Sequence, residues 1–425
     1  MTLQQEILGS GLKVLIREVH AAPVVSVRVW YRVGARYENP GSTGISHWVE
    51  HVLFRGTPRW PSGEADRAIS RQGGVYNGVT SHDFTVFYET LPASSLALAI
   101  DIEADRMAYA TLDPSVIEKE RAIIIAERQG NENSPLFRLT EETSATAYTV
   151  HPYGHMTIGH LSDLESMTTA EVQQHHATYY GPNNAIVTIA GDVDAEQTLA
   201  LVAQAFAPIP RGPDPQEVQA VEPPQRGERQ VIVRGAGRTN YLEIAYHAPP
   251  ASDPDFHALT VLNAILSGGS GFVIGGGHTT NVTSRLYRAL VDTRMVVDID
   301  GYLAPTVDPG LLRFSATLAR DQQAEPVIAR FEEEITRLRS GPVHQSELEK
   351  AQRQAQALFA YASESISSQA FWLGFAEIVA DQTWFRNYLQ DIASVTTDDI
   401  QRVAQQYLTP CNRTVGLYLA DEGEC

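Results

Sequence analysis

The sequence has little cysteine, no long apolar run and a shortage of positive charge. Its two cysteines, Cys411 and Cys425, exclude a disulfide framework and a cysteine-based zinc site. No apolar stretch approaches the roughly 18 residues that a membrane-spanning helix needs. Acidic residues outnumber basic ones by 51 to 32, and the formal charge of −19 argues against nucleic acid or an anionic membrane as main partner.

Low cysteine use favours a cytoplasmic location. The first residues lack a basic start followed by an apolar stretch, so we expect no signal peptide. A periplasmic location is the alternative if such a peptide has been removed. The length of 425 residues predicts two or more domains.

Two distant stretches match without gaps at a constant offset of 228 residues, one beginning at Leu164 and the other at Ile392. Both open a helix with two threonines followed by an acidic residue, stop near a proline and continue as a β-rich run. The identical pairs include Thr168/Thr396, Pro182/Pro410 and Asn184/Asn412. A period this long is typical of a duplicated domain, not of a solenoid.

A Pro-rich, polar segment at 208–228 is predicted to be the linker. It separates an N-terminal domain, 1–207, from a homologous C-terminal domain, 229–425. Both halves read as strands, then helices, then strands again. We therefore predict an α+β fold of two homologous sandwich domains, each a mostly antiparallel sheet packed with helices.

The segment "SHWVEHVLF", residues 46–54, carries polar groups in a core-like stretch. Turn residues on both sides predict a short helix. On that helix His47 and His51 share a face, and Glu50 lies beside them. Buried imidazoles and carboxylates are costly without partners, and two histidines four apart can reach one tetrahedral Zn²⁺. The pattern predicts a zinc site with Glu50 as general base; two structural histidines are the alternative.

A third ligand is expected on a helix that starts at Pro114, after an Asp113 cap, and ends near Gly130. Glu120 and Glu127 are seven apart on it and therefore share a face. A carboxylate on an apolar helix face is unusual unless it is paired or bound to metal. The alternative for Glu127 is that it is simply one of the charged residues at the end of this helix.

The order His-x-x-Glu-His, followed 76 positions later by Glu127, resembles the pitrilysin family of zinc metallopeptidases, the inverzincins. In particular it is similar to the mitochondrial-processing-peptidase-like branch. "GISHWVEHVLFRGT", "EKERAIIIAER" and "HPYGHMTIGHLSDLESMT" resemble family segments in family order, and the resemblance covers essentially the whole chain.

The resemblance implies a role for each matched position. His47, His51 and Glu127 would bind zinc, Glu50 would be the general base, and Glu120 would orient a histidine ligand. An edge strand around "YNGVTS" would receive an extended peptide substrate by β-augmentation. The candidate substrate contacts on that strand are Asn77, Gly78, Val79 and Thr80.

The second half departs from the family pattern. It has no His-x-x-Glu-His, so one zinc site per chain is expected. Active family members carry an Arg and a Tyr, seven apart, that donate hydrogen bonds to the scissile carbonyl. Those positions fall here on Val291 and Asp298. Arg294 and Tyr302 lie nearby but eight apart, and whether they substitute for the pair is left open.

In this family the second half of one chain faces the zinc of its partner. We therefore expect a heterodimer in which a homologous subunit supplies the Arg/Tyr pair, with a homodimer as the alternative. The predicted function is a zinc-dependent endopeptidase, or its zinc-bearing subunit, acting on extended peptides in a closed two-subunit chamber. The alternatives are a non-catalytic structural or binding subunit that retains zinc and, more weakly, a metal-storage protein.

One further segment, 266–287, is rich in glycine. It resembles the substrate-contacting glycine-rich loop of the non-catalytic subunit of mitochondrial processing peptidase. An ordinary surface loop is the alternative.

Overall fold

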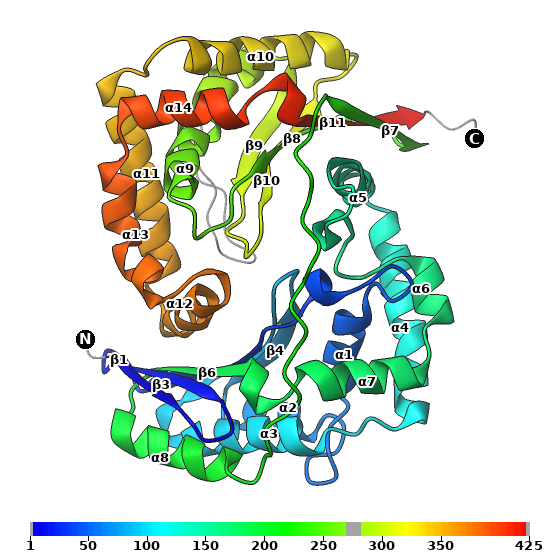
Figure 1. Ribbon diagram of the computed structural model, residues 1–425, viewed down its shortest axis with the longest axis vertical. Coiled ribbons are helices and arrows are strands. Elements are labelled where there is room, and N and C mark those ends of the chain that lie inside the picture. Colours follow the sequence, from blue (N-terminus) through cyan, green and yellow to red (C-terminus); the bar gives the residue numbers. More distant parts are fainter. Residues whose placement is uncertain (1–2, 269–281, 422–425) are drawn as a thin grey trace. The chain divides into compact units, whose positions relative to one another are not determined.

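The computed structural model describes residues 3–268 and 282–421 (Figure 1). The central part of the glycine-rich segment therefore lies outside the described residues. Among the described residues, no helix is both long and apolar enough to cross a membrane. The chain divides into two compact units, and each contains one sheet with its own helices.

The first unit has a six-stranded sheet of order β1-β2-β6-β3-β5-β4. Its strands, in chain order, are β1 (Leu3–Ile7), β2 (Lys13–Glu18), β3 (Val24–Tyr31), β4 (Val75–Thr80), β5 (Thr85–Pro92) and β6 (Ala185–Gly191). Its helices are α1 (Ile45–Leu53), α2 (Glu64–Arg71), α3 (Leu96–Tyr109), α4 (Pro114–Glu132), α6 (Leu161–Ser166), α7 (Thr169–Tyr179), α8 (Ala195–Phe206) and α12 (Ile366–Val379).

The second unit has a five-stranded sheet of order β7-β11-β8-β10-β9. Its strands are β7 (Arg229–Ala236), β8 (Tyr241–Ala248), β9 (Val296–Leu303), β10 (Gly310–Leu318) and β11 (Arg413–Asp421). Its helices are α5 (Pro135–Ala147), α9 (Asp255–Ser267), α10 (Ala324–Ser340), α11 (Gln345–Ala362), α13 (Gln382–Ser394) and α14 (Thr397–Tyr407).

The two sheets have the same strand order if β7, β11, β8, β10 and β9 stand for β2, β6, β3, β5 and β4. In the described part of the chain, β2 with β6 and β7 with β11 are the parallel pairs, and the other pairs are antiparallel. The prediction of an α+β fold with two mostly antiparallel sheets is therefore confirmed.

The internal repeat reappears as matching local structure. Thr168 and Thr396 each open a helix with a capping box, and the helices α7 and α14 have the same length. After each helix an asparagine amide donates back to the tyrosine that ends it, Asn184 to Tyr179 O and Asn412 to Tyr407 O, both at 2.8 Å. The shared residues are thus those that start the helix, end it and lead into the next strand.

The compact units are not the contiguous ranges 1–207 and 229–425. Asn131–Gly154, with α5, belongs to the second unit, and Ser363–Ile378, with most of α12, belongs to the first. In the first unit α12 packs on β3 so closely that a Cβ on Gly374 would lie 2.1 Å from Trp30 Nε1 (Figure 1). In the second, α5 packs on β11, where a Cβ on Gly416 would lie 2.0 Å from Thr143 Oγ1.

The exchange has a physical reason in the first unit. Strand β3 is buried along nearly its whole length, so its sheet needs helices on both faces. The segment 208–228 is likewise shared between the units. In its second part, the Glu222 carboxylate accepts hydrogen bonds from three successive backbone N–H groups, those of Thr149, Val150 and His151.

The end of α4 corrects another expectation. The helix begins at Pro114 as predicted, and Asp113 Oδ1 accepts a hydrogen bond from Ser115 N at 2.7 Å. It continues past Gly130 to Glu132. Gly130 is exposed, and a glycine inside a helix costs only about 1 kcal/mol relative to alanine, so it does not stop the helix.

Candidate metal centre

The central helix of the first unit, α1, is held in place at its start. Its N-cap Gly44 has φ 87°, a conformation that favours glycine. The buried Glu38 carboxylate accepts hydrogen bonds from Gly44 N at 2.7 Å and Ser46 N at 2.9 Å. His155 Nε2 lies 3.0 Å from the same carboxylate. The negative charge of Glu38 thus faces the positive end of the helix, which stabilises it.

The two histidines of α1 and Glu127 of α4 come together. His47 Nε2 lies 4.0 Å from Glu127 Oε1, and His51 Nε2 lies 3.4 Å from Glu127 Oε2. One ligand atom from each of the three side chains lies within 4.8 Å of the other two. Burial and the neighbouring His51 lower the pKa of His47 to about 4, which favours the neutral imidazole that metal binding requires.

This donor set fits a four-coordinate zinc ion. Ligand bonds of about 2.0–2.2 Å in a tetrahedron put the ligand atoms roughly 3.3–3.6 Å apart. The Nε2–Oε2 distance of 3.4 Å between His51 and Glu127 is within that range. The 4.0 Å between His47 and Glu127 requires a movement of only a few tenths of an ångström. Three protein donors leave a fourth position free, as in catalytic zinc sites.

Glu50 is buried between α1 and the outer strand β4. Its Oε2 accepts a hydrogen bond from Thr80 Oγ1 at 2.7 Å. Burial raises the pKa of Glu50, which the Thr80 hydrogen bond opposes. A Cβ on Gly78 would lie 3.1 Å from Glu50 Oε1 and 2.9 Å from the Phe54 ring. The strand can therefore approach the carboxylate this closely only because residue 78 is glycine.

Glu120 lies behind His51. Its Oε2 is 3.5 Å from His51 Nδ1, the ring nitrogen that does not face Glu127. Arg55 neutralises this buried carboxylate through Nε–Oε1 at 2.5 Å and Nη2–Oε2 at 2.8 Å. Glu120 is thus placed to hold the ring of His51 so that Nε2 faces Glu127.

The predicted substrate residues all lie on β4, whose one neighbour among the described strands is β5. Asn77 is exposed, and Gly78, Val79 and Thr80 are half-buried. Asn77 Oδ1 accepts a hydrogen bond from Gly78 N at 2.8 Å. The outer edge of β4 leaves backbone groups available for another strand.

The second unit has other residues, Val291 and Asp298, at the two positions that the resemblance assigns to the Arg–Tyr pair. Val291 ends the π-helical turn Tyr287–Val291, and Asp298 on β9 accepts a hydrogen bond from Thr317 N at 3.2 Å. Arg294 is exposed in the turn before β9 with φ 61°, and Tyr302, 46% exposed, is on β9.

Sequence reasoning missed several residues around the candidate site. Arg55 lies four residues after His51, so helical spacing could have indicated it. Glu38 lies only six residues before the N-cap Gly44, so its position ahead of α1 could have indicated it. His155 is distant in sequence from α1, and no local signal points to it. The role of Gly78 in admitting β4 beside Glu50 also depends on packing alone.

Two matching α+β units with a His–Glu–His helix in the first define a two-domain, peptidase-like fold. Residues 13–160 match the family described as insulinase, peptidase family M16, and residues 166–355 match its companion domain, described as the peptidase M16 inactive domain. The chain belongs to this M16 family, also called the pitrilysin family, as its motifs predict.

The relatives support this assignment. A zinc protease, PqqE, of Helicobacter pylori is 28% identical over 414 residues, 96% of this chain and 90% of that protein. A crystal structure of a protease from Helicobacter pylori superposes with a TM-score of 0.91 at 27% identity, covering 98% of this chain and 99% of that one. A probable mitochondrial-processing peptidase subunit beta of Arabidopsis thaliana is 27% identical over 282 residues, 66% of this chain and 53% of that protein.

Proposed function

We propose that the chain is a zinc-dependent endopeptidase, or the zinc-bearing subunit of one, that cleaves extended peptides. The observation that carries this proposal is the convergence of His47, His51 and Glu127 within 4.8 Å beside the buried Glu50. The names of relatives, which include zinc proteases, support the choice of zinc.

Each of these residues would have a distinct role in the reaction. His47, His51 and Glu127 would hold the ion, which when bound would supply Lewis-acid polarisation of the scissile carbonyl and acidify a water molecule. Glu50 would accept the proton of the attacking water and pass it to the leaving amine. The Thr80 hydroxyl would keep the Glu50 carboxylate oriented. The free edge of β4 would align the peptide as an added strand.

Glu50→Gln tests the proposal, because the amide retains the shape of the side chain but cannot accept the proton. We expect peptide hydrolysis to fall by at least about 100-fold with unchanged zinc content. Chelation should abolish hydrolysis, and added Zn²⁺ should restore it. Glu64→Gln, at a half-buried glutamate on α2 that is not part of the candidate site, serves as control. Hydrolysis that persists in Glu50→Gln would contradict the proposal.

We further propose that a homologous partner subunit supplies the Arg/Tyr pair, with a homodimer as the alternative. The substitution of both family positions by Val291 and Asp298 supports this, and one relative is itself named a subunit. The second candidate function, a zinc-retaining subunit without catalysis, is favoured by the same substitution. Peptidase assays of the pure chain and of the chain co-purified with its partner distinguish these cases. Full activity of the pure chain excludes the partner requirement. Inactivity of both preparations favours the non-catalytic subunit.

A further inference from the structure

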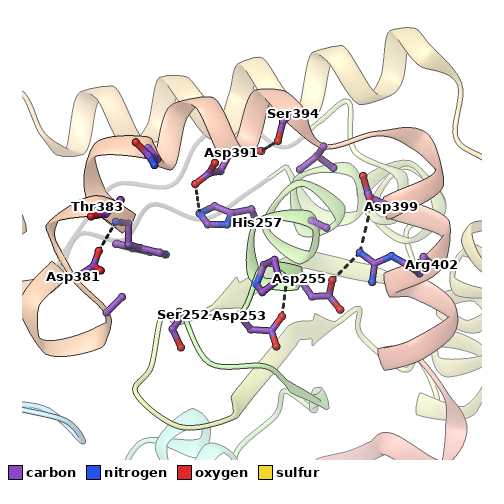
Figure 2. Close-up of a pocket in the computed structure, with 16 residues that line it drawn as sticks. Ser252, Asp253, Asp255, His257, Asp381, Thr383, Asp391, Ser394, Asp399 and Arg402 are labelled. Carbon is purple, nitrogen blue, oxygen red and sulfur yellow. Dashed lines mark hydrogen bonds and ion pairs between the residues drawn. The ribbon is translucent and has the colours of Figure 1, made fainter.

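A pocket of about 730 Å³ lies within the second unit, away from the residues assigned above (Figure 2). It is formed by the first residues of α9 and α14 and by one side of α13. Among the described residues that line it, Arg402 is the one lysine or arginine. The lining carboxylates are Asp253, Asp255, Asp381, Asp391 and Asp399. The pocket therefore carries an excess of negative charge.

Most of these carboxylates already have structural roles. Asp255 pairs with Arg402 at 2.7 Å and accepts a hydrogen bond from Tyr407 Oη at 3.0 Å. Asp381 and Asp399 accept from backbone N–H groups at the starts of α13 and α14. Asp391 differs, because its carboxylate accepts no hydrogen bond from the described residues and lies 3.9 Å from His257 Nε2.

His257 and Trp384 add two unsatisfied nitrogens to the same pocket. The residues are 7% and 8% exposed. His257 Nε2 and Trp384 Nε1 are buried without a hydrogen-bond partner in the described part of the chain. Burial lowers the pKa of His257, so its imidazole is neutral at neutral pH and Nε2 can accept a hydrogen bond. Figure 2 shows the ring of His257 facing Asp391 across the pocket.

We propose that this pocket binds a basic residue of a peptide, taking its ammonium or guanidinium group between His257 and Asp391. A gap of 3.9 Å between two acceptor atoms is bridged by one cationic nitrogen that carries at least two N–H bonds and donates one to each acceptor at about 2.8 Å. Unpaired buried polar atoms are costly, and such a ligand satisfies Nε2 of His257 directly.

The indole N–H of Trp384 favours a peptide residue over a simple amine as the ligand of this pocket. This group only donates, so it requires an acceptor such as a carbonyl oxygen. A peptide residue offers both a cation and a carbonyl, whereas a diamine offers the cation alone.

Calorimetric titration of the full chain with N-acetyl-arginine amide tests the proposal, with N-acetyl-citrulline amide as the uncharged isostere. We expect one saturable site for the arginine derivative and at least 10-fold weaker binding of citrulline. Asp391→Asn should weaken arginine binding at least 10-fold, because it removes the unpaired charge from a half-exposed side chain. Trp384→Phe, which keeps the aromatic face, should weaken it several-fold.

The matched control is Asp398→Asn, an exposed aspartate in the first turn of α14 that does not line the pocket. It should leave the affinity unchanged. Equal losses in Asp391→Asn and Asp398→Asn would overturn the proposal, because they would reflect general attraction to an acidic protein. Absence of saturable binding, or equal binding of citrulline, would also overturn it. Putrescine binding as tight as the arginine derivative would overturn the assignment to a peptide residue.

Discussion

The helices α1 and α9 occupy the same place in the two units but differ in chemistry. Gly78 on β4 faces Glu50 and Phe54, and Gly301 on β9 faces Asn263 and Ser267 in the same way. This correspondence puts Thr260 and Ala264 where α1 has its two histidines. Asn263 donates to Gly301 O at 3.1 Å and accepts from Ser267, so its polar groups are satisfied within the unit.

The comparison separates the packing that both units share from the side chains that give the first unit its candidate metal site. Both units place a polar side chain of the central helix under a glycine of the outermost strand. In the second unit this group is a neutral amide that bonds to the strand. In the first it is a carboxylate next to two imidazoles, an arrangement that an isolated core does not stabilise. Four predictions test this comparison.

The largest effect is expected from His51→Ala, which gives α1 the side chain that α9 has at the equivalent position. It should abolish stoichiometric zinc binding and reduce hydrolysis by about 1000-fold or more, because one of three protein donors is lost. Metal analysis and a peptide assay measure the two effects. The control His257→Ala in α9 should leave zinc content unchanged, and loss of zinc in both variants would contradict a single site in the first unit.

The next effect concerns the two matched glycines. In Gly78→Ala the new methyl group would press on Phe54 and Glu50, so we expect about 10- to 100-fold slower hydrolysis. In Gly301→Ala it would lie 2.2 Å from Asn263 Oδ1 and should lower the melting temperature of the second unit instead. Equal activity in the wild type and Gly78→Ala would show that β4 does not position Glu50.

The cap on α1 predicts a pH dependence of stability. Burial alone would raise the pKa of Glu38, but the hydrogen bonds from His155 and from Gly44 and Ser46 N–H outweigh it and hold the pKa below the ordinary 4.5. The stabilisation is therefore complete above about pH 4.5 and is lost as the pH falls through the lowered value.

Glu38→Gln should cost about 2 kcal/mol of unfolding free energy at pH 7, since hydrogen bonds to a buried charge are removed. The difference from the wild type should shrink as the pH falls below about 4.5 and through the lowered pKa of Glu38. Thermal unfolding between pH 7 and pH 3 measures it. A difference that stays constant over this range would contradict the role of the ionised carboxylate.

The smallest effects should be equal in the two units. Thr168→Ala and Thr396→Ala each remove one side of a capping box, at a cost of about 1 kcal/mol. Hydrogen exchange should accelerate about 5-fold in α7 or in α14, whichever helix carries the change. Clearly unequal accelerations would mean that the shared sequence no longer has a shared structural role.

Much of the candidate site was accessible from local spacing. The pattern at His47, Glu50 and His51 indicated a helix with three polar groups on one side, and α1 has that form. Glu127 could be proposed because α4 has a clear start at Pro114. The roles of these residues remain predictions until metal and activity are measured.

Other features could not be predicted because they depend on contacts between distant segments. The exchange of α5 and α12 between the halves leaves no mark on helical or strand periodicity, since a buried face looks the same whichever sheet covers it. The pocket around His257 is similar: the sequence shows scattered aspartates, and only the packing of α9, α13 and α14 brings them together.

The sequence by itself determined the family, the duplicated α+β architecture and the helix that carries His47 and His51, because motif spacing and capping are local properties of the chain. Tertiary structure alone decided which helix covers which sheet, how near β4 approaches Glu50, and how Glu120, paired with Arg55, lies against His51. Those relations are set by close packing, in which a single glycine or a buried ion pair determines the distance between segments far apart in the chain.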